Sequence, residues 1–175
     1  SMELVRFASS GTEATLNAIR VARAYTGKYG IAKFEGGYHG SHEYASISVH
    51  PPAEKLDPDG PTAIPEFPGM PPSVAEGVVV LPYNDLAACE KILRERHREL
   101  ACVIMEAVVS NFGYAPAEIG FLRGMRDLTR ELGMLLVFDE VQSLRIAPGG
   151  AQQMFGVEPD LTALGKIIGG GMPAG

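Results

Sequence analysis

Short, uninterrupted apolar runs recur along the chain and are separated by segments with helical periodicity. Continuous apolar runs are typical of strands that are buried on both faces. They predict strands at 4–8, 31–34, 78–81, 102–105, 134–138 and 161–164, and helices at 9–25, 85–100 and 119–132. This alternation predicts an α/β fold, in which a mostly parallel sheet carries helices on both faces.

A proline-rich segment interrupts the alternation. Eight of the thirteen prolines lie between Pro51 and Pro72. Proline lacks a backbone donor and fixes its own φ, so neither a regular helix nor a central strand is expected there. The segment is also too long for a simple connection. Residues 51–77 are therefore interpreted as an excursion over the surface, serving as a flap or a subunit contact.

The composition is that of a globular protein, with 46% hydrophobic and 21% charged residues. The net charge is -6 without a basic cluster, so nucleic acid is not an expected partner. No apolar run approaches the ~20 residues that span a bilayer, and no signal-peptide pattern is seen. We therefore expect no membrane partner and a cytoplasmic location. Cys89 and Cys102 are interpreted as buried free thiols in a reducing compartment.

Lys166 lies in the apolar, glycine-dense run LGKIIGGGM. Glycines also mark ordinary loops, so one interpretation is a solvated loop lysine. The other is an amine removed from water, because desolvation disfavours the charged form and leaves a better nucleophile. The run alone does not separate these two interpretations.

The tetrapeptide Ser10-Gly11-Thr12-Glu13 opens the first predicted helix. It reads as a capping box, in which Ser10 caps the helix and Glu13 reaches back. It also reads as an anion site, because a glycine turn at a helix start presents free N–H groups and the positive end of the dipole to a phosphate. Both interpretations can hold at once.

Two further stretches follow predicted strands. The GGYHG stretch places Tyr38 and His39 between glycines, either as a tight turn or as a platform for a flat heterocycle. Asp139 follows a wholly apolar strand, either as a helix cap or as the partner of a pyridine nitrogen, with Val141 packing on the ring. His39, His42 and Glu43 could also suggest a metal site, but histidines three residues apart without a second ligand cluster are weak evidence, so we expect no metal.

These residues fall at the carboxyl ends of strands, where open parallel sheets bind ligands. A phosphate cradle, an aromatic platform, a carboxylate and a lysine in an apolar run are the parts that a pyridoxal phosphate site requires. A nucleotide-binding domain is the competing interpretation. It is disfavoured because neither GxGxxG after a strand nor GxxxxGK[ST] occurs.

The order FxSSGTEA, GGYHG, FDEV and LGKIIGGGMPAG resembles class III aminotransferases of fold type I. It is most similar to the glutamate-1-semialdehyde aminomutase-like branch, which also holds β-amino acid aminotransferases. The resemblance implies pyridoxal 5'-phosphate as cofactor, bound as a Schiff base to Lys166, which then shuttles the proton. It further implies that Asp139 pairs with the pyridinium nitrogen and that Ser10, Gly11 and Thr12 hold the phosphate.

The resemblance assigns the remaining cofactor contacts as well. Tyr38 would stack on the ring with His39 beside it, and Val141 and Gln142 would lie near the ring and its hydroxyl. Glu106 and Asn111 would line the site. Ala107 departs from the pattern, because the family usually has proline after the residue that corresponds to Glu106.

The match implies that residues 1–175 are the central part of the large, cofactor-binding domain, without the N-terminal segment and the C-terminal small domain. Members of the family are homodimers that act on a small-molecule amino donor and a keto acceptor. The implied reaction is amino-group transfer on an amino acid or related amine. Two alternatives stay open: an aminomutase that moves the amine within one molecule, and a truncated cofactor-binding module without independent catalysis.

Overall fold

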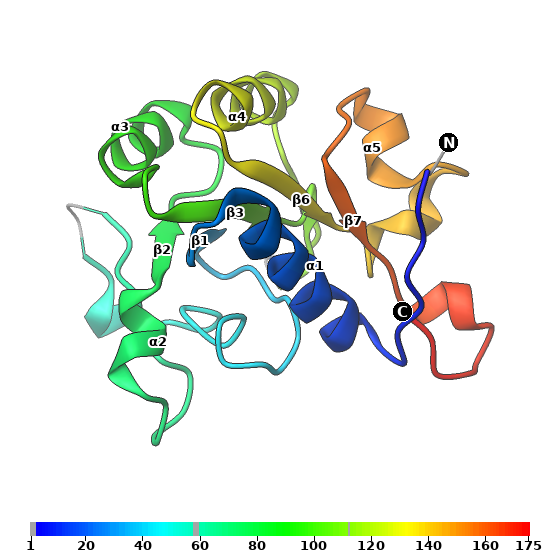
Figure 1. Ribbon diagram of the computed structural model, residues 1–175, viewed down its shortest axis with the longest axis horizontal. Helices are drawn as coiled ribbons and strands as arrows, with labels where there is room; N and C mark the ends of the chain where they lie inside the picture. Colours follow the sequence, from blue (N-terminus) through cyan, green and yellow to red (C-terminus); the bar gives the residue numbers. More distant parts are fainter. Residues whose placement is uncertain (1–2, 58–59, 112) are drawn as a thin grey trace.

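The computed structural model describes residues 3–57, 60–111 and 113–175, which fold around one parallel sheet (Figure 1). Across the sheet the strands are β2 (Val78–Leu81), β1 (Gly30–Phe34), β3 (Leu100–Met105), β6 (Leu135–Asp139) and β7 (Leu161–Ala163). Every neighbouring pair in this sheet is parallel. The predicted α/β class is confirmed.

Helices cover both faces of the sheet, as its apolar strands require. Helix α1 (Gly11–Thr26) lies on one face, and α3 (Leu86–Arg96) and α4 (Ile119–Glu131) lie on the other (Figure 1). Successive residues of β1 point to opposite layers: Ile31 packs in the cluster under α1, and Ala32 packs in the cluster under α3 and α4. The sheet is therefore buried on both sides.

Smaller elements complete the described chain. They are the 3-10 turns Ala53–Lys55, Ser143–Ile146 and Lys166–Gly169, helices α2 (Pro72–Glu76) and α5 (Gly150–Phe155), and the antiparallel pair β4 (Val108–Val109) and β5 (Ala115–Pro116). The apolar pattern did not predict these elements, because each is too short to show a period.

The strand predicted at 4–8 is wrong. Ala8 and Gly175 exchange two backbone hydrogen bonds, with N···O distances of 2.7 and 2.8 Å, but no strand is assigned to the preceding residues. The side chains of Leu4 and Phe7 are 94% and 89% exposed. A strand needs a row of partners as well as apolar residues, and the described chain offers only this one. The helix predicted to reach residue 100 ends at Arg96, because Leu100 already belongs to β3.

The proline-rich segment is mostly irregular, but the expectation that it holds no helix is wrong at its end. Pro72 begins α2, where its missing N–H is not needed because the first helical N–H groups have no intrahelical acceptor. A single antiparallel bridge joins Ile47 to Pro65. Residues 58–59 of the segment lie outside the described part. Its service as a flap or subunit contact stays a prediction.

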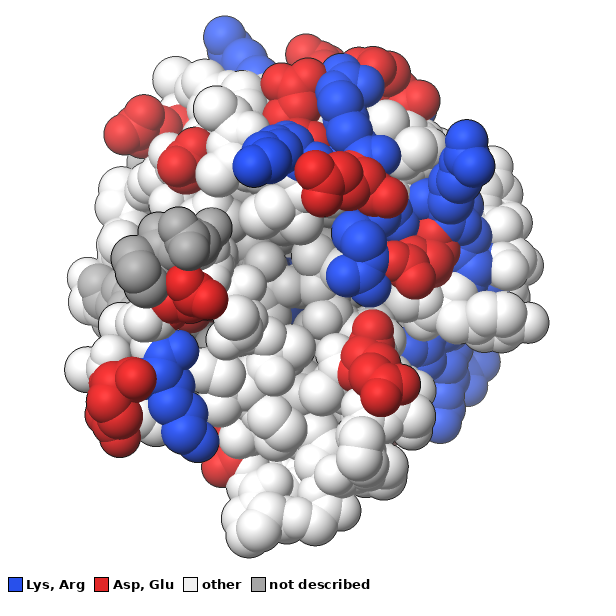
Figure 2. Space-filling model, turned by 90° about the vertical axis from the view of Figure 1, so that its left-hand side faces the viewer, with Lys and Arg blue, Asp and Glu red and all other residues white. Residues whose placement is uncertain are grey.

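The two thiols are buried and free, as predicted. Burial raises the pKa of Cys89 and of Cys102 to about 12, so both stay protonated at neutral pH. Within the part of the chain that the structure describes, no helix is long and apolar enough to cross a membrane. Basic and acidic side chains lie beside one another over the upper part of the face shown in Figure 2, and the lower centre carries few charges. Arg94 of α3, for example, pairs with Glu90 and with Glu131.

Candidate active site

A cavity of about 140 Å³ lies where the carboxyl ends of β1, β3 and β6 meet the start of α1. Its lining residues are Ser10, Gly11, Thr12, Tyr38, His39, Gly40, Glu106, Ser110, Asp139, Val141, Gln142 and Lys166. All predicted site residues except Asn111 are among them. Asn111 instead donates from Nδ2 to the carbonyl of Gly36, at 3.3 Å, and so holds the loop that precedes Tyr38.

The start of α1 forms one end of the cavity. Ser10 caps the helix by accepting the N–H of Glu13 at 3.2 Å, which confirms half of the capping box. The other half is shifted by one residue, because the Glu13 carboxylate accepts the N–H and hydroxyl of Ser9, both at 2.8 Å. The N–H groups of Gly11 and Thr12 have no acceptor among the described residues. They remain available for an anion at the positive end of the helix dipole.

Glycines let the loops around the cavity approach one another closely. A Cβ atom on Gly11 would lie 2.7 Å from Cγ2 of Val141, and one on Gly165 would lie 3.2 Å from the backbone N of Gly11. Gly40 has a φ of +101°, and a Cβ atom there would lie 2.6 Å from Oγ1 of Thr12. The absence of side chains at these glycines therefore brings the helix start, the GGYHG loop, the FDEV turn and the lysine loop together.

Asp139 lies at the bottom of the cavity, at the end of β6, and is 4% exposed. Its Oδ2 lies 2.9 Å from Nδ1 of His39, and its Oδ1 accepts the N–H of Val141 at 3.1 Å. Nε2 of His39 is buried without a hydrogen-bond partner. A buried carboxylate held by two donors has a fixed orientation, as a partner of a ring nitrogen requires.

The neighbouring residue Glu140, and not Asp139, is the helix cap that was one interpretation of Asp139. It is fully buried and caps α5 by accepting the N–H groups of Ala151 (2.7 Å) and Gln152 (2.9 Å). It also accepts the hydroxyl of Ser143 at 2.9 Å. The helix cap in the Asp139-Glu140 pair is thus Glu140, which sequence reasoning missed.

Glu106, at the end of β3, holds the aromatic loop in place. Its Oε1 accepts the N–H of Tyr38 at 3.2 Å, and its Oε2 accepts the hydroxyl of Ser110 at 2.8 Å. The ring of Tyr38 is 43% exposed and borders the cavity. The turn after Glu106 forms without the family's proline, because the carbonyl of Ala107 accepts the N–H of Ala117 at 2.9 Å.

A second polar network anchors the same loop to α1. The hydroxyl of Thr15 donates to the carbonyl of His39 at 2.7 Å and lies 3.3 Å from Nε2 of His42. Nδ1 of His42 accepts the N–H of Ala45 at 3.3 Å, so the neutral ring carries its proton on Nε2. Burial lowers the pKa of His42 to about 4. No group of three or more potential metal ligands occurs among the residues that the structure describes.

Lys166 lies on the wall of the cavity but is exposed to solvent. Its φ of 50° is in the left-handed region, which non-glycine residues adopt rarely and often at functional sites. Of the two interpretations of the glycine-dense run, a solvent-exposed lysine is the one that this chain shows. The neighbouring Ile167 and Ile168 are exposed as well.

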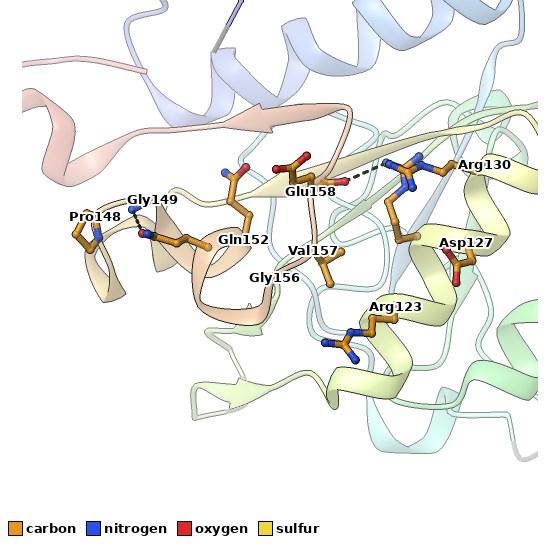
Figure 3. A pocket seen from close by; sticks show the side chains of 11 residues that line it. Arg123, Asp127, Arg130, Pro148, Gly149, Gln152, Gly156, Val157 and Glu158 are labelled. Atoms are coloured by element: carbon orange, nitrogen blue, oxygen red, sulfur yellow. Dashed lines mark hydrogen bonds between the residues drawn. The ribbon is translucent and has the colours of Figure 1, made fainter. Parts of the chain in front are cut away.

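A wider cavity of about 1010 Å³ separates α4 from residues 148–158 (Figure 3). Arg123 and Asp127 of α4 line one side, and Gly149 and Glu158 line the other. None of the predicted site residues borders this cavity. The smaller cavity is the candidate active site because the chemically distinctive side chains converge there.

The fold and the site together define a chain of the aminotransferase type. It belongs to the aminotransferase class-III family, whose family model matches residues 1–175.

The relatives that it resembles have more than one activity. Glutamate-1-semialdehyde 2,1-aminomutase of Pelotomaculum thermopropionicum is 47% identical over 176 residues, which are 100% of this chain and 39% of that protein. An omega-transaminase from Sphaerobacter thermophilus has 47% identity and a TM-score of 0.92, covering 99% of this chain and 40% of that one. A β-phenylalanine aminotransferase from Variovorax paradoxus has 36% identity and a TM-score of 0.78, covering 99% and 36%. The chain thus spans well under half the length of these relatives.

Proposed function

We propose that this chain is the cofactor-binding part of a pyridoxal phosphate-dependent aminotransferase, the central part of its large domain. The observation that carries the proposal is that Gly11, Asp139 and Lys166, which are far apart in sequence, border one cavity. Two similar solved structures are a transaminase with pyridoxal phosphate (PLP) bound and a glutamate-1-semialdehyde aminomutase in complex with pyridoxamine phosphate (PMP). The longer protein would be a cytoplasmic homodimer acting on a small-molecule amino donor and a keto acceptor.

The lining residues fit pyridoxal phosphate group by group. The free N–H groups of Gly11 and Thr12, with the hydroxyl of Ser10, would bind the phosphate. Tyr38 would stack on the ring, and Val141 and Gln142 would contact the ring and its hydroxyl. Glu106 and Asn111 would act through the loop that they hold.

When bound, pyridoxal phosphate supplies a protonated pyridine ring that withdraws electrons from the carbon bearing the amino group. Asp139 would pair with the ring nitrogen, because a buried carboxylate favours the positively charged form of a neighbouring base. His39 keeps that carboxylate oriented through its 2.9 Å contact. Lys166 would hold the cofactor through its amine, and the same amine would serve as the base that moves a proton at the substrate carbon.

An aminomutase is the second candidate, and the 47% identity to the Pelotomaculum enzyme favours it. It would use the same side chains, but the amine would return to a neighbouring carbon of the same molecule. A cofactor-binding module without independent catalysis is the third candidate. The exposure of Lys166 favours this one, because the cavity does not enclose the amine that would carry the cofactor.

Cofactor trapping tests the proposal. The purified chain is incubated with pyridoxal phosphate, reduced with borohydride and mapped by peptide mass spectrometry. We expect one adduct on Lys166, its loss in Lys166→Ala, and its retention in the matched variant Lys91→Ala, which removes another exposed lysine. Adducts spread over several lysines, or none, would refute the binding site in this chain.

Amino donors then separate the three candidates. A loaded chain that releases a keto acid from an added amino acid acts as an aminotransferase. Rearrangement of glutamate-1-semialdehyde without release of a keto acid indicates the aminomutase. A chain that binds the cofactor at Lys166 but turns over neither compound is the binding module alone.

A further inference from the structure

Lys33 is a fully buried lysine in β1 that does not border the cavity. It forms no ion pair with any carboxylate in the described part of the chain. Its amine donates instead to two backbone carbonyls, those of Phe34 (3.3 Å) and Ile47. Burying an amine is unfavourable unless its donors are satisfied, so this arrangement calls for a reason.

The two carbonyls belong to the two segments that support the GGYHG loop. The carbonyl of Phe34 also accepts the N–H of Gly37 at 3.0 Å, which closes the turn after β1. Ile47 immediately precedes Ser48, whose carbonyl accepts the N–H of Gly36 at 2.7 Å. The amine of Lys33 therefore bonds to both sides of the turn that leads into Tyr38.

The segment at residue 47 is itself held by hydrogen bonds. Ser48 is fully buried with a φ of 48°, a conformation that non-glycine residues keep only where the surroundings impose it. Its N–H donates to the carbonyl of Ile64 and its hydroxyl to that of Thr62, both at 2.7 Å. Lys33 thus ties the turn to a fixed support that includes the proline-rich segment.

Three carboxylates act on the Lys33 amine through space. Glu106, Glu66 and Glu35 raise its pKa, whereas burial lowers it, and burial dominates to give about 8. Glu106 also accepts the N–H of Tyr38. Lys33 lies just before the turn between residues 34 and 38, and Glu106 binds the N–H group at the end of that turn. Their opposite charges attract each other.

We propose that Lys33 is a positioning residue, which fastens the end of β1 and the segment at residue 47 to one point and thereby fixes Tyr38 and His39 beside the cavity. The amine acts through backbone carbonyls and does not border the cavity. The effect on loop order stands without any cofactor. Only the effect on cofactor affinity rests on the function proposed above.

Amide hydrogen exchange by NMR in the whole chain tests the proposal. In Lys33→Met, the amides of Gly36, Gly37 and Tyr38 should exchange about tenfold faster, the factor that loss of one or two hydrogen bonds gives. The amide of Leu136, which donates to Asp160, serves as an internal reference. A general loss of stability would speed all four amides together and would refute a positioning role.

Lys28→Met is the matched control. Lys28 also donates to two backbone carbonyls, those of His97 (2.9 Å) and Gly133 (3.0 Å), at sites away from the loop. Its loss should leave the amides of the loop unchanged. Lys33→Gln retains donors without charge and should restore part of the protection. If Lys33→Met does not fold, Lys33→Gln replaces it in the exchange experiment. Loop amides that exchange in Lys33→Gln at the wild-type rate would then count against the proposal.

Pyridoxal phosphate affinity gives a second, separate readout. Lys33→Met should raise the cofactor Kd about tenfold, and Lys28→Met should leave it unchanged. A wild-type chain that binds no cofactor refutes the proposed function but leaves the exchange experiment valid. A chain that binds normally in Lys33→Met, with unaltered loop exchange, overturns the role of Lys33 alone.

Discussion

Substitution of Gly11 by alanine should destabilise the start of α1, although alanine is usually the better helix residue. The added Cβ would lie 2.7 and 3.0 Å from the two γ carbons of Val141, closer than ordinary van der Waals contact. Val141 is β-branched and has few rotamers with which to move away. Overpacking of this kind costs about 1–3 kcal/mol. Alanine in a helix returns about 0.5–1 kcal/mol.

The net expectation for Gly11→Ala is a loss of up to about 2.5 kcal/mol in the free energy of unfolding. At about 2–4 °C per kcal/mol for a chain of this size, Tm should fall by a few degrees. Relief of the contact by displacement of the helix start would also move the N–H groups of Gly11 and Thr12. The affinity for pyridoxal phosphate should therefore fall about tenfold or more, which corresponds to a loss of at least about 1.4 kcal/mol of binding free energy.

Gly120→Ala in α4 is the matched control, because a Cβ atom there meets nothing within 4 Å. That variant should gain about 0.5–1 kcal/mol and bind the cofactor as the wild type does. Urea unfolding followed by circular dichroism, with absorbance titration of the cofactor, measures both variants. If Gly11→Ala is as stable as the wild type and binds the cofactor equally well, the close approach of Gly11 to Val141 is not needed for stability or for cofactor binding.

Three further results are expected. Glu140→Ala should lower the free energy of unfolding by more than about 3 kcal/mol, because several buried donors lose their acceptor. The control is Glu158→Ala, which removes an exposed carboxylate, and equal losses of stability in the two variants would contradict the capping role. The free energy of unfolding should fall as the pH drops from 6.5 towards 4, because only the unfolded form then protonates His42; His42→Gln should flatten this dependence, and a ring that titrates near 6.5 by NMR would exclude it. Asp139→Asn should abolish amino transfer but permit trapping on Lys166, whereas full activity would remove Asp139 from the mechanism.

The sheet was predictable because its strands are buried on both faces and so appear as short runs that are almost wholly apolar. The same criterion failed at residues 4–8, where Leu4 and Phe7 lie in water. Hydrophobicity reports a tendency to be buried, but strand formation also depends on a neighbouring backbone. No local pattern reveals whether that neighbour exists.

Most lining residues of the candidate site were predictable because they follow strands in short, glycine-rich stretches. Lys33 and Glu140 were not, because their partners are backbone groups that only the folded chain brings near them. A lysine inside GIAKF is indistinguishable by sequence from one that points into solvent. Buried charged residues that support the site through backbone contacts, without lining the cavity, are thus the ones that sequence reasoning does not identify.

The two ends of the cavity differ in how firmly the chain holds them. Asp139 is buried, oriented by His39 and Val141, and cannot turn without breaking both contacts. Lys166 is exposed at the start of the 3-10 turn Lys166–Gly169, and its amine has no hydrogen-bond partner among the described residues. This difference suits the two roles. Under the proposed function, Asp139 would keep one orientation beside the ring nitrogen, whereas the amine of Lys166 would need freedom to carry a proton.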